Sequence, residues 1–212
     1  MTQPNRWGGR WRLRIGVLGG SFNPAHEGHL HISLAALKML RLDQVWWLVA
    51  PQNPLKATDG MAPLAKRMAG ARKVARHPAL RVTDIEVALG TRFTADTLAA
   101  LRRRFPAVTF VWLMGADNLA QMPRWQRWHE IFAHHPVAVF DRSPYSYRSL
   151  GGQAAHRFEH RRVVGRSAAM LARSALPAWV YAHQPRHPAS ATEIRKKLAA
   201  LVAKRAKSEG AA

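Results

Sequence analysis

Two histidines, His26 and His29, stand three residues apart behind a short apolar run, in the stretch GVLGGSFNPAHEGHL (16–30). At this spacing in a helix their imidazoles lie one turn apart on the same face. Each can donate a hydrogen bond to one anion there and, when protonated, add a positive charge. Gly19 and Gly20 follow the apolar run, so the backbone can turn tightly and approach a ligand without a Cβ in the way. The spacing therefore predicts a phosphate site at the start of a helix.

The helix that follows strengthens this prediction, because its first N–H groups are unpaired and its dipole adds about half a positive charge at the same place. Plainer explanations exist for each component: glycines after a strand are common in turns, and two histidines at this spacing can bind zinc. The stretch lacks an HExxH pattern and an acidic third ligand, so no metal site is predicted. It also lacks the Gly-Lys-Ser/Thr ending of a P-loop and the third glycine of a dinucleotide fingerprint.

These residues need elements to position them, and apolar runs alternate with helical patterns along the chain. Strands are predicted at 13–18, 44–50, 80–87, 107–115, 135–142 and 178–183, and helices at 29–40, 62–75, 94–105, 124–132 and 190–204. This alternation predicts an α/β fold with a doubly wound, mainly parallel sheet and helices on both faces. Ligands of such sheets bind beyond the carboxyl ends of the strands. Residues 143–174 show no clear periodicity, and no elements are predicted there.

Length and composition limit the classes of protein. With 212 residues, 48% of them apolar, the chain can bury one sizeable core, which predicts a single domain over 1–212 with flexible ends at 1–11 and 203–212. No window reaches the roughly 18 consecutive apolar residues of a membrane span, and the N-terminus has no apolar signal region, so we expect a cytoplasmic protein. The absence of cysteine excludes disulfides, thiolate catalysis and cysteine-ligated zinc.

The charge balance points to an anionic partner. The chain has 33 Lys and Arg against 12 Asp and Glu, a formal net charge of +21. Nucleic acid, an acidic surface and phosphorylated small molecules all fit this excess. Many arginines can equally well solvate helix faces, as in LRRRF at 101–105, so the charge alone does not choose among these readings.

The stretch GGSFNPAHEGHL (19–30) resembles the (T/S)xxH/HxGH signature of the nucleotidyltransferase superfamily, which joins a phosphate-bearing substrate to a nucleoside triphosphate and releases pyrophosphate. Four further segments resemble one branch, the bacterial nicotinate-nucleotide adenylyltransferases: APQNPLK (50–56), RFTADTL (92–98), GADNLAQMPRW (115–125) and SATEIRKKL (190–198). The resemblance implies a Rossmann-like nucleotidyltransferase fold. It also implies adenylyl transfer from ATP to nicotinate mononucleotide, giving nicotinate adenine dinucleotide and pyrophosphate in NAD biosynthesis.

The resemblance assigns roles on the ATP side. His26 and His29 are implied to contact the triphosphate and stabilise the transferring phosphoryl group, with Arg195 as a charge clamp; these three form the implied catalytic set. The implied ATP-binding set is Gly19, Gly20, Ser21, Phe22, His26, His29, Gly115, Ser190, Thr192 and Arg195. Ala191 stands where the family often has serine, which removes a hydroxyl from the C-terminal motif.

On the acceptor side the implied residues are Lys56, Thr94, Asp117 and Trp125. Lys56 would meet the mononucleotide phosphate, and Thr94 with nearby N–H groups would receive the nicotinate carboxylate. Asp117 would contact the pyridine nucleotide, and the indole of Trp125 would stack on the electron-poor pyridine ring. Plainer roles stay open: Trp125 as a core residue, Asp117 as a helix cap, and Thr94 as the cap of the helix at 94–105.

The implied reaction needs ATP, nicotinate mononucleotide and Mg²⁺ carried by ATP; no membrane or specific nucleic-acid partner is expected. Because the attacking phosphate oxygen is already an anion, no general base and no covalent intermediate are expected. Two alternatives remain. One is an adenylyltransferase of the same fold that acts on phosphopantetheine, which would not need the GAD…W and TxxT elements. The other is a basic nucleic-acid-binding protein, which would not explain the ordered motifs.

Overall fold

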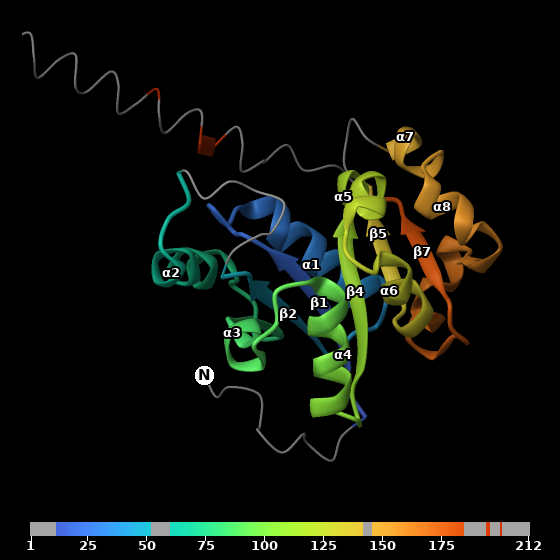
Figure 1. Ribbon diagram of the computed structural model, residues 1–212, viewed down its shortest axis with the longest axis horizontal. Helices are drawn as coiled ribbons and strands as arrows, with labels where there is room; N and C mark the ends of the chain where they lie inside the picture. The colour runs from blue at the N-terminus through green and yellow to red at the C-terminus, as the bar shows by residue number, and fades with distance from the viewer. Residues whose placement is uncertain (1–11, 52–59, 142–145, 185–193, 196–199, 201–212) are drawn as a thin grey trace, which may run out of the picture.

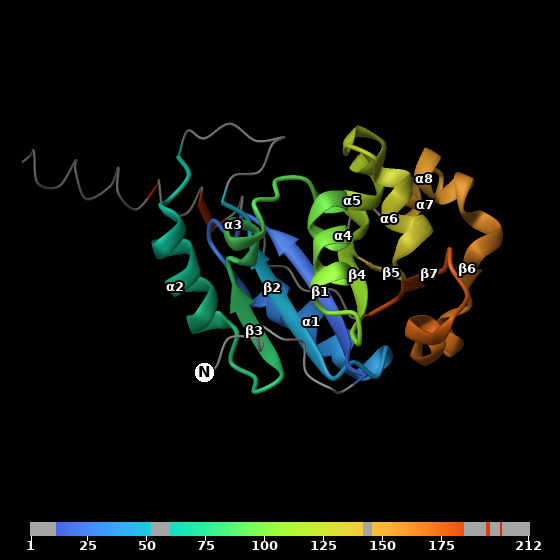
Figure 2. The same ribbon diagram turned by 60° about the horizontal axis from the view of Figure 1, so that its bottom comes forward.

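Seven strands lie side by side in one sheet, in the order β3-β2-β1-β4-β5-β7-β6, and every neighbouring pair is parallel. The computed structural model describes residues 12–51, 60–141, 146–184, 194, 195 and 200. The strands are β1 (Arg14–Gly20), β2 (Gln44–Val49), β3 (Leu80–Thr83), β4 (Thr109–Gly115), β5 (Val137–Phe140), β6 (Arg162–Val163) and β7 (Trp179–Ala182). Figure 2 shows this order from β3 on the left to β6 on the right. The predicted α/β fold with a parallel sheet is confirmed.

Helices cover both faces of the sheet. They are α1 (Glu27–Met39), α2 (Leu64–Val74), α3 (Ile85–Leu89), α4 (Thr94–Arg104), α5 (Ala116–Gln121), α6 (Trp128–His134), α7 (Ser146–Leu150) and α8 (Gln153–Arg157), with 3-10 turns η1 (Met122–Arg124), η2 (Glu159–Arg161) and η3 (Gly165–Arg173). One buried cluster joins the sheet to α4, α5, α6 and α8, and the other joins it to α1, α2 and η3 (Figure 1). Among the described helices, none is long and apolar enough to cross a membrane.

The sheet is buried on both faces because its strands are apolar at nearly every position. In β4, Trp112 packs into the first cluster and Leu113 into the second. In β1, Val17 and Leu18 divide in the same way. Continuous apolar runs of this kind are typical of parallel strands covered by helices on both sides.

The chain reverses its direction across the sheet between β1 and β4. From β1 it proceeds to β2 and β3 on one side, and from β4 it proceeds to β5 and β7 on the other. The two central strands are in register, with Leu18 beside Leu113, so the segments that follow β1 and β4 start next to each other. In doubly wound sheets such a switch point is where ligands bind.

Two local predictions were wrong near the start of α4. The strand predicted at 80–87 ends at Thr83, whose Oγ1 accepts a hydrogen bond from the N–H of Ile85 at 3.1 Å, so the chain turns into α3. Thr94 is not the cap of α4 but its first residue. The N-cap is Phe93, which makes no side-chain capping bond.

Three other segments differ in detail from the prediction. The helix predicted at 124–132 is interrupted, because Arg127 has a left-handed backbone with φ of 49° between η1 and α6. Residues 143–174, where no elements were predicted, contain α7, α8, η2, β6 and η3. Of the helix predicted at 190–204, the described residues 194, 195 and 200 are helical, and the rest lies outside the described part of the chain.

Candidate active site

The start of α1 is built by the two histidines themselves. His26 is the N-cap, in extended backbone, and its Nδ1 accepts a hydrogen bond from the N–H of Gly28 at 3.1 Å. The N–H of His26 in turn donates to Nδ1 of His29 at 3.2 Å. This reciprocal arrangement is a capping box, which usually needs Ser or Thr with Glu or Gln. The three-residue spacing of His26 and His29, which predicted a phosphate site, therefore also fixes both rings at the start of α1.

These hydrogen bonds determine which ring nitrogen carries the proton. A nitrogen that accepts from a backbone N–H has no proton of its own, so His26 and His29 each carry theirs on Nε2. The ring centroids lie only 3.9 Å apart, which disfavours a positive charge on both. In this arrangement each imidazole presents Nε2 as a hydrogen-bond donor.

The side chain of Phe22 packs against one of these two rings, that of His29. Its side chain is 2% exposed, its ring stacks on Trp47 at 5.1 Å, and the ring of His29 lies 4.7 Å away. Its backbone has φ of 47°, a left-handed conformation that is uncommon for a bulky residue. Backbone strain of this kind persists where the surroundings fix it, commonly at functional sites. The resemblance implied only backbone contacts for Phe22, but its side chain also packs against the ring of His29.

The C-terminal motif reaches the same turn. Nη1 of Arg195 donates to the carbonyl of Asn23 at 2.8 Å. The side chain of Asn23 accepts from the N–H of Ala62 at 3.3 Å and donates to the carbonyl of Gly60 at 3.1 Å. The turn after β1 therefore contacts both the region before α2 and the C-terminal segment. Ser190 and Thr192, the other predicted residues of that motif, lie outside the described residues.

Gly19 and Gly20 belong to β1, where they pair with Leu48 and Val49 of β2. A Cβ on Gly19 would lie 2.6 Å from Cη2 of Trp112, whereas one on Gly20 would meet the ring of Phe22 only at an ordinary 3.5 Å. The prediction that both glycines follow the strand was therefore wrong. The space that Gly19 leaves is filled by the Trp112 ring.

Trp112, which fills this space beside Gly19, also contacts the predicted acceptor residue Trp125. The indole of Trp112 lies edge-on to that of Trp125, with ring centroids 6.2 Å apart. Its Nε1 is buried and has no hydrogen-bond partner among the described residues. Trp125 is half-buried and packs against the core, and its stacking on the pyridine ring stays a prediction. Nothing in the sequence distinguishes Trp112 from the other residues of a buried strand.

Two other predicted acceptor residues, Thr94 and Asp117, lie in the first turns of α4 and α5, and Gly115 of the predicted ATP-binding set precedes α5. Gly115 ends β4 and is the N-cap of α5, and Asp117 is a half-buried residue in the first turn of that helix rather than its cap. Thr94 begins α4. An ion pair between Arg127 and Asp96 joins the segment that follows Trp125 to the first turn of α4. Lys56 lies outside the described residues.

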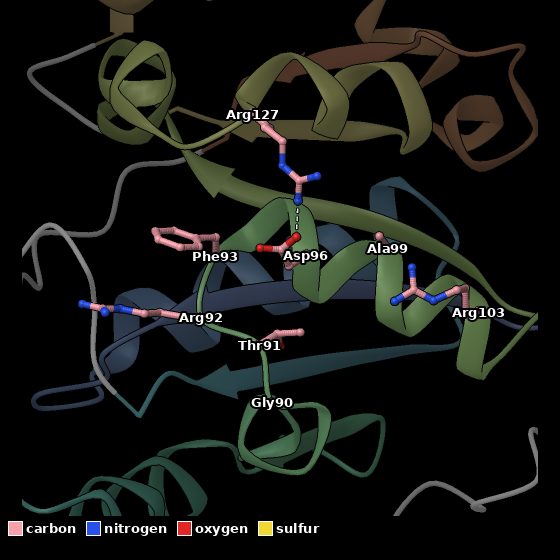
Figure 3. Close-up of a pocket in the computed structure, with 8 residues that line it drawn as sticks. All are labelled: Gly90, Thr91, Arg92, Phe93, Asp96, Ala99, Arg103 and Arg127. Atoms are coloured by element: carbon pink, nitrogen blue, oxygen red, sulfur yellow. Dashed lines mark hydrogen bonds and ion pairs between the residues drawn. The ribbon is translucent and has the colours of Figure 1, made fainter.

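An open depression of about 450 Å³ lies beside this acceptor region (Figure 3). It is lined by Phe93 and the outward face of α4, and contains three arginines against the single carboxylate of Asp96. Arg127 points toward Asp96, and Arg103 extends from the far end of α4 toward Ala99, whereas the side chain of Arg92 extends from the loop away from Asp96 (Figure 3). The described acceptor residues Thr94, Asp117 and Trp125 are not among its lining residues. Within the described residues, no cluster of three or more His, Asp or Glu could hold a metal ion.

Comparison with solved structures supports the fold. A Plasmodium falciparum nicotinic acid mononucleotide adenylyltransferase complexed with NaAD aligns with a TM-score of 0.64 over 87% of this chain and 83% of that one. The sequence identity is 15%, so this similarity shows the fold alone.

Comparison by sequence is more specific. The cytidylyltransferase-like family matches residues 17–197. A probable nicotinate-nucleotide adenylyltransferase of Bradyrhizobium sp. (strain ORS 278) is 52% identical over 86% of this chain and 95% of its own length. One from Parvibaculum lavamentivorans is 50% identical over 87% of this chain and 92% of its own length. The chain therefore belongs to the nicotinate-nucleotide adenylyltransferase family, within the cytidylyltransferase-like group.

Proposed function

We propose that this chain transfers the adenylyl group of ATP to nicotinate mononucleotide, forming nicotinate adenine dinucleotide and releasing pyrophosphate. The observation that carries the proposal is the two-histidine capping box of α1 at the switch point between β1 and β4, with Arg195 bonded to the same turn. The names of relatives that share half of their residues with the chain support this choice of acceptor.

The chemistry requires alignment and charge stabilisation more than proton transfer. A phosphate oxygen of the mononucleotide attacks the α-phosphorus of ATP, a new P–O bond forms, and the bond to the β-phosphate breaks as pyrophosphate leaves. The attacking oxygen is already an anion, so no general base is needed. His26 and His29 would donate from Nε2 to the transferring phosphoryl group, and Arg195 would hold the phosphates that leave.

We propose that ATP binds as its magnesium complex. Magnesium keeps several of its own waters and needs few protein ligands, so a site rich in neutral donors and arginine suits the complexed triphosphate. The metal would neutralise part of the phosphate charge when bound. His26, His29 and Arg195 would bind the oxygens of the triphosphate.

The acceptor would bind beside Trp125 and the start of α4. The ring of Trp125 would stack on the pyridine, and the first N–H groups of α4, starting at Thr94, would receive the carboxylate. Asp117 and Lys56 complete the proposed acceptor set. A carboxylate gains a charge-assisted hydrogen bond that an amide lacks, so we propose a preference for the acid over the amide mononucleotide.

The test is pyrophosphate release by the purified chain with magnesium ATP, with nicotinate mononucleotide, nicotinamide mononucleotide and phosphopantetheine as parallel acceptors. We expect turnover with the first and much less with the second. Turnover with phosphopantetheine alone would overturn the acceptor and retain the fold and the histidines. Silence with all three, together with salt-dependent binding to unrelated DNA, would favour the nucleic-acid-binding alternative.

Replacement of Trp125 by alanine should mainly weaken acceptor binding. Loss of one aromatic stacking partner is expected to raise KM for nicotinate mononucleotide about tenfold, with a small effect on KM for ATP. Trp125→Phe retains an aromatic face and should recover most of the affinity. A change confined to KM for ATP would show that Trp125 belongs to the other half of the site.

A further inference from the structure

Arg67 of α2 is a buried charge that the sequence analysis did not single out. Arg67 is only 4% exposed, and its guanidinium group donates four hydrogen bonds, all to backbone carbonyls. Nη1 reaches the carbonyls of Ser21 and Ala50, both at 2.7 Å. Nη2 reaches Pro51 at 2.9 Å, and Nε reaches Ala62 at 2.8 Å. One guanidinium therefore fastens three separate segments of the chain.

Two of those segments lead into the regions proposed to bind phosphate. Ser21 lies in the turn between β1 and the two-histidine start of α1. Ala50 and Pro51 follow β2 and open the APQNPLK segment. Ala62 lies just before α2 and also donates its N–H to the side chain of Asn23. The hydrogen bonds from Arg67 hold the carbonyl groups of Ser21, Ala50 and Pro51 in place. They therefore fix the orientation of the peptide planes at the turn after β1 and at the start of the segment after β2.

The charge of Arg67 is not balanced nearby. None of the described acidic residues forms an ion pair with it. Carbonyl dipoles satisfy its N–H donors but leave the full positive charge in place, and a guanidinium stays protonated at neutral pH. A buried charge without a counterion is costly, and an anion that binds close by reduces that cost.

We propose that Arg67 is a positioning residue for the polyphosphate: it holds the turn after β1 in its binding geometry and supplies an uncompensated positive charge behind that turn. The proposal rests on the proposed function for its ligand class, a nucleotide triphosphate or the pyrophosphate that leaves. It distinguishes Arg67 from an arginine that only stabilises the fold, because the predicted effect falls on phosphate groups and not on the nucleoside.

The test compares two ligands on the full chain by calorimetry: magnesium pyrophosphate and adenosine. Arg67→Met keeps much of the side-chain volume and removes the charge and all four hydrogen bonds. We expect its Kd for pyrophosphate to rise about tenfold or more, and its Kd for adenosine to stay within about twofold of wild type. Arg67→Lys keeps the charge but cannot reach four carbonyls, so it should weaken pyrophosphate binding by about threefold. Arg72→Met, at an exposed position of the same helix, is the matched control and should change neither.

A purely structural role gives a different result. Partial unfolding lowers the stoichiometry of binding and leaves both dissociation constants unchanged. Wild-type affinity for pyrophosphate in the folded Met variant, or an equal loss for both ligands, would overturn the proposal. If Arg67→Met does not fold, Arg67→Lys decides the question in the same way. Pyrophosphate binding by a wild-type chain that fails to adenylylate nicotinate mononucleotide would overturn the proposed acceptor and leave this inference standing.

Discussion

Replacement of His29 by alanine is expected to lower kcat by about two to three orders of magnitude, because it removes a preorganised donor from the transferring phosphoryl group. His29 is held in place by the N–H of His26 and by the ring of Phe22, so its orientation is set before substrate binds. A donor that needs no reorganisation during the reaction contributes most to the transition state. Steady-state turnover with magnesium ATP and nicotinate mononucleotide measures the loss.

Two further variants separate the chemical role of His29 from its structural role. Asn can place an amide oxygen near the position of Nδ1, so His29→Asn keeps the capping acceptor and loses the Nε2 donor. Gln is a usual residue at this position of a capping box, and its NH₂ group can lie near the position of Nε2, so His29→Gln can keep both the capping acceptor and a donor. We expect the Gln variant to retain more activity than the Asn variant, and both variants to stay within about 1 kcal/mol of the stability of wild type. Urea unfolding measures the stability.

Equal activities near that of wild type in the Asn and Gln variants would show that His29 matters through the helix cap and not through its donor. Normal turnover in a folded His29→Ala variant would remove the residue from the catalytic set altogether. The control is His31, a half-buried residue of the same helix two positions on, whose replacement by alanine should leave kcat within about twofold.

The elements that position the site could be predicted because their patterns are local. Each central strand is a continuous apolar run, and the helix cap at His26 is built from residues within one turn of each other. Predictions were wrong where a short-range hydrogen bond competed with the pattern. At Thr83, a side-chain acceptor ends the strand although apolar residues continue beyond it.

Contacts between distant segments could not be predicted from the pattern. Gly19 is a glycine because Trp112, from another strand, fills the space beside it. Arg67 did carry a signal, since it shares the buried face of α2 with Met68 and Ala71, where a charged residue is unexpected. That signal indicates an inward-facing charge but not its partners, which come from three other segments.

A second large effect is expected on stability at acidic pH, through His135. This residue is the C-cap of α6 and is 5% exposed. Burial lowers the pKa of His135 to about 4 from 6.5; Arg102 and His134 add to the lowering, and a hydrogen bond with the backbone of Phe110 opposes it. The folded chain therefore keeps the imidazole neutral at pH values where the unfolded chain protonates it.

The sign of the effect follows from proton binding. Between pH 6.5 and pH 4 the unfolded state binds more protons at His135 than the folded state, so stability falls as the pH falls through this window. Above pH 6.5 both states are neutral at this residue and the effect is absent. A shift of this size corresponds to about 3 kcal/mol of unfolding free energy, reached near pH 4.

Urea unfolding at pH 7 and pH 4 tests this on wild type and on His135→Gln, which cannot titrate. Other groups also contribute: burial raises the pKa of Glu86, which acts in the opposite direction. The quantity to compare is therefore the pH-dependent loss in wild type minus that in the variant, expected at about 3 kcal/mol. His129→Gln, at an exposed position of the same helix, should lose as much stability as wild type. If His135→Gln also loses as much, the acid sensitivity of the fold comes from other groups, because a histidine that titrates normally contributes none.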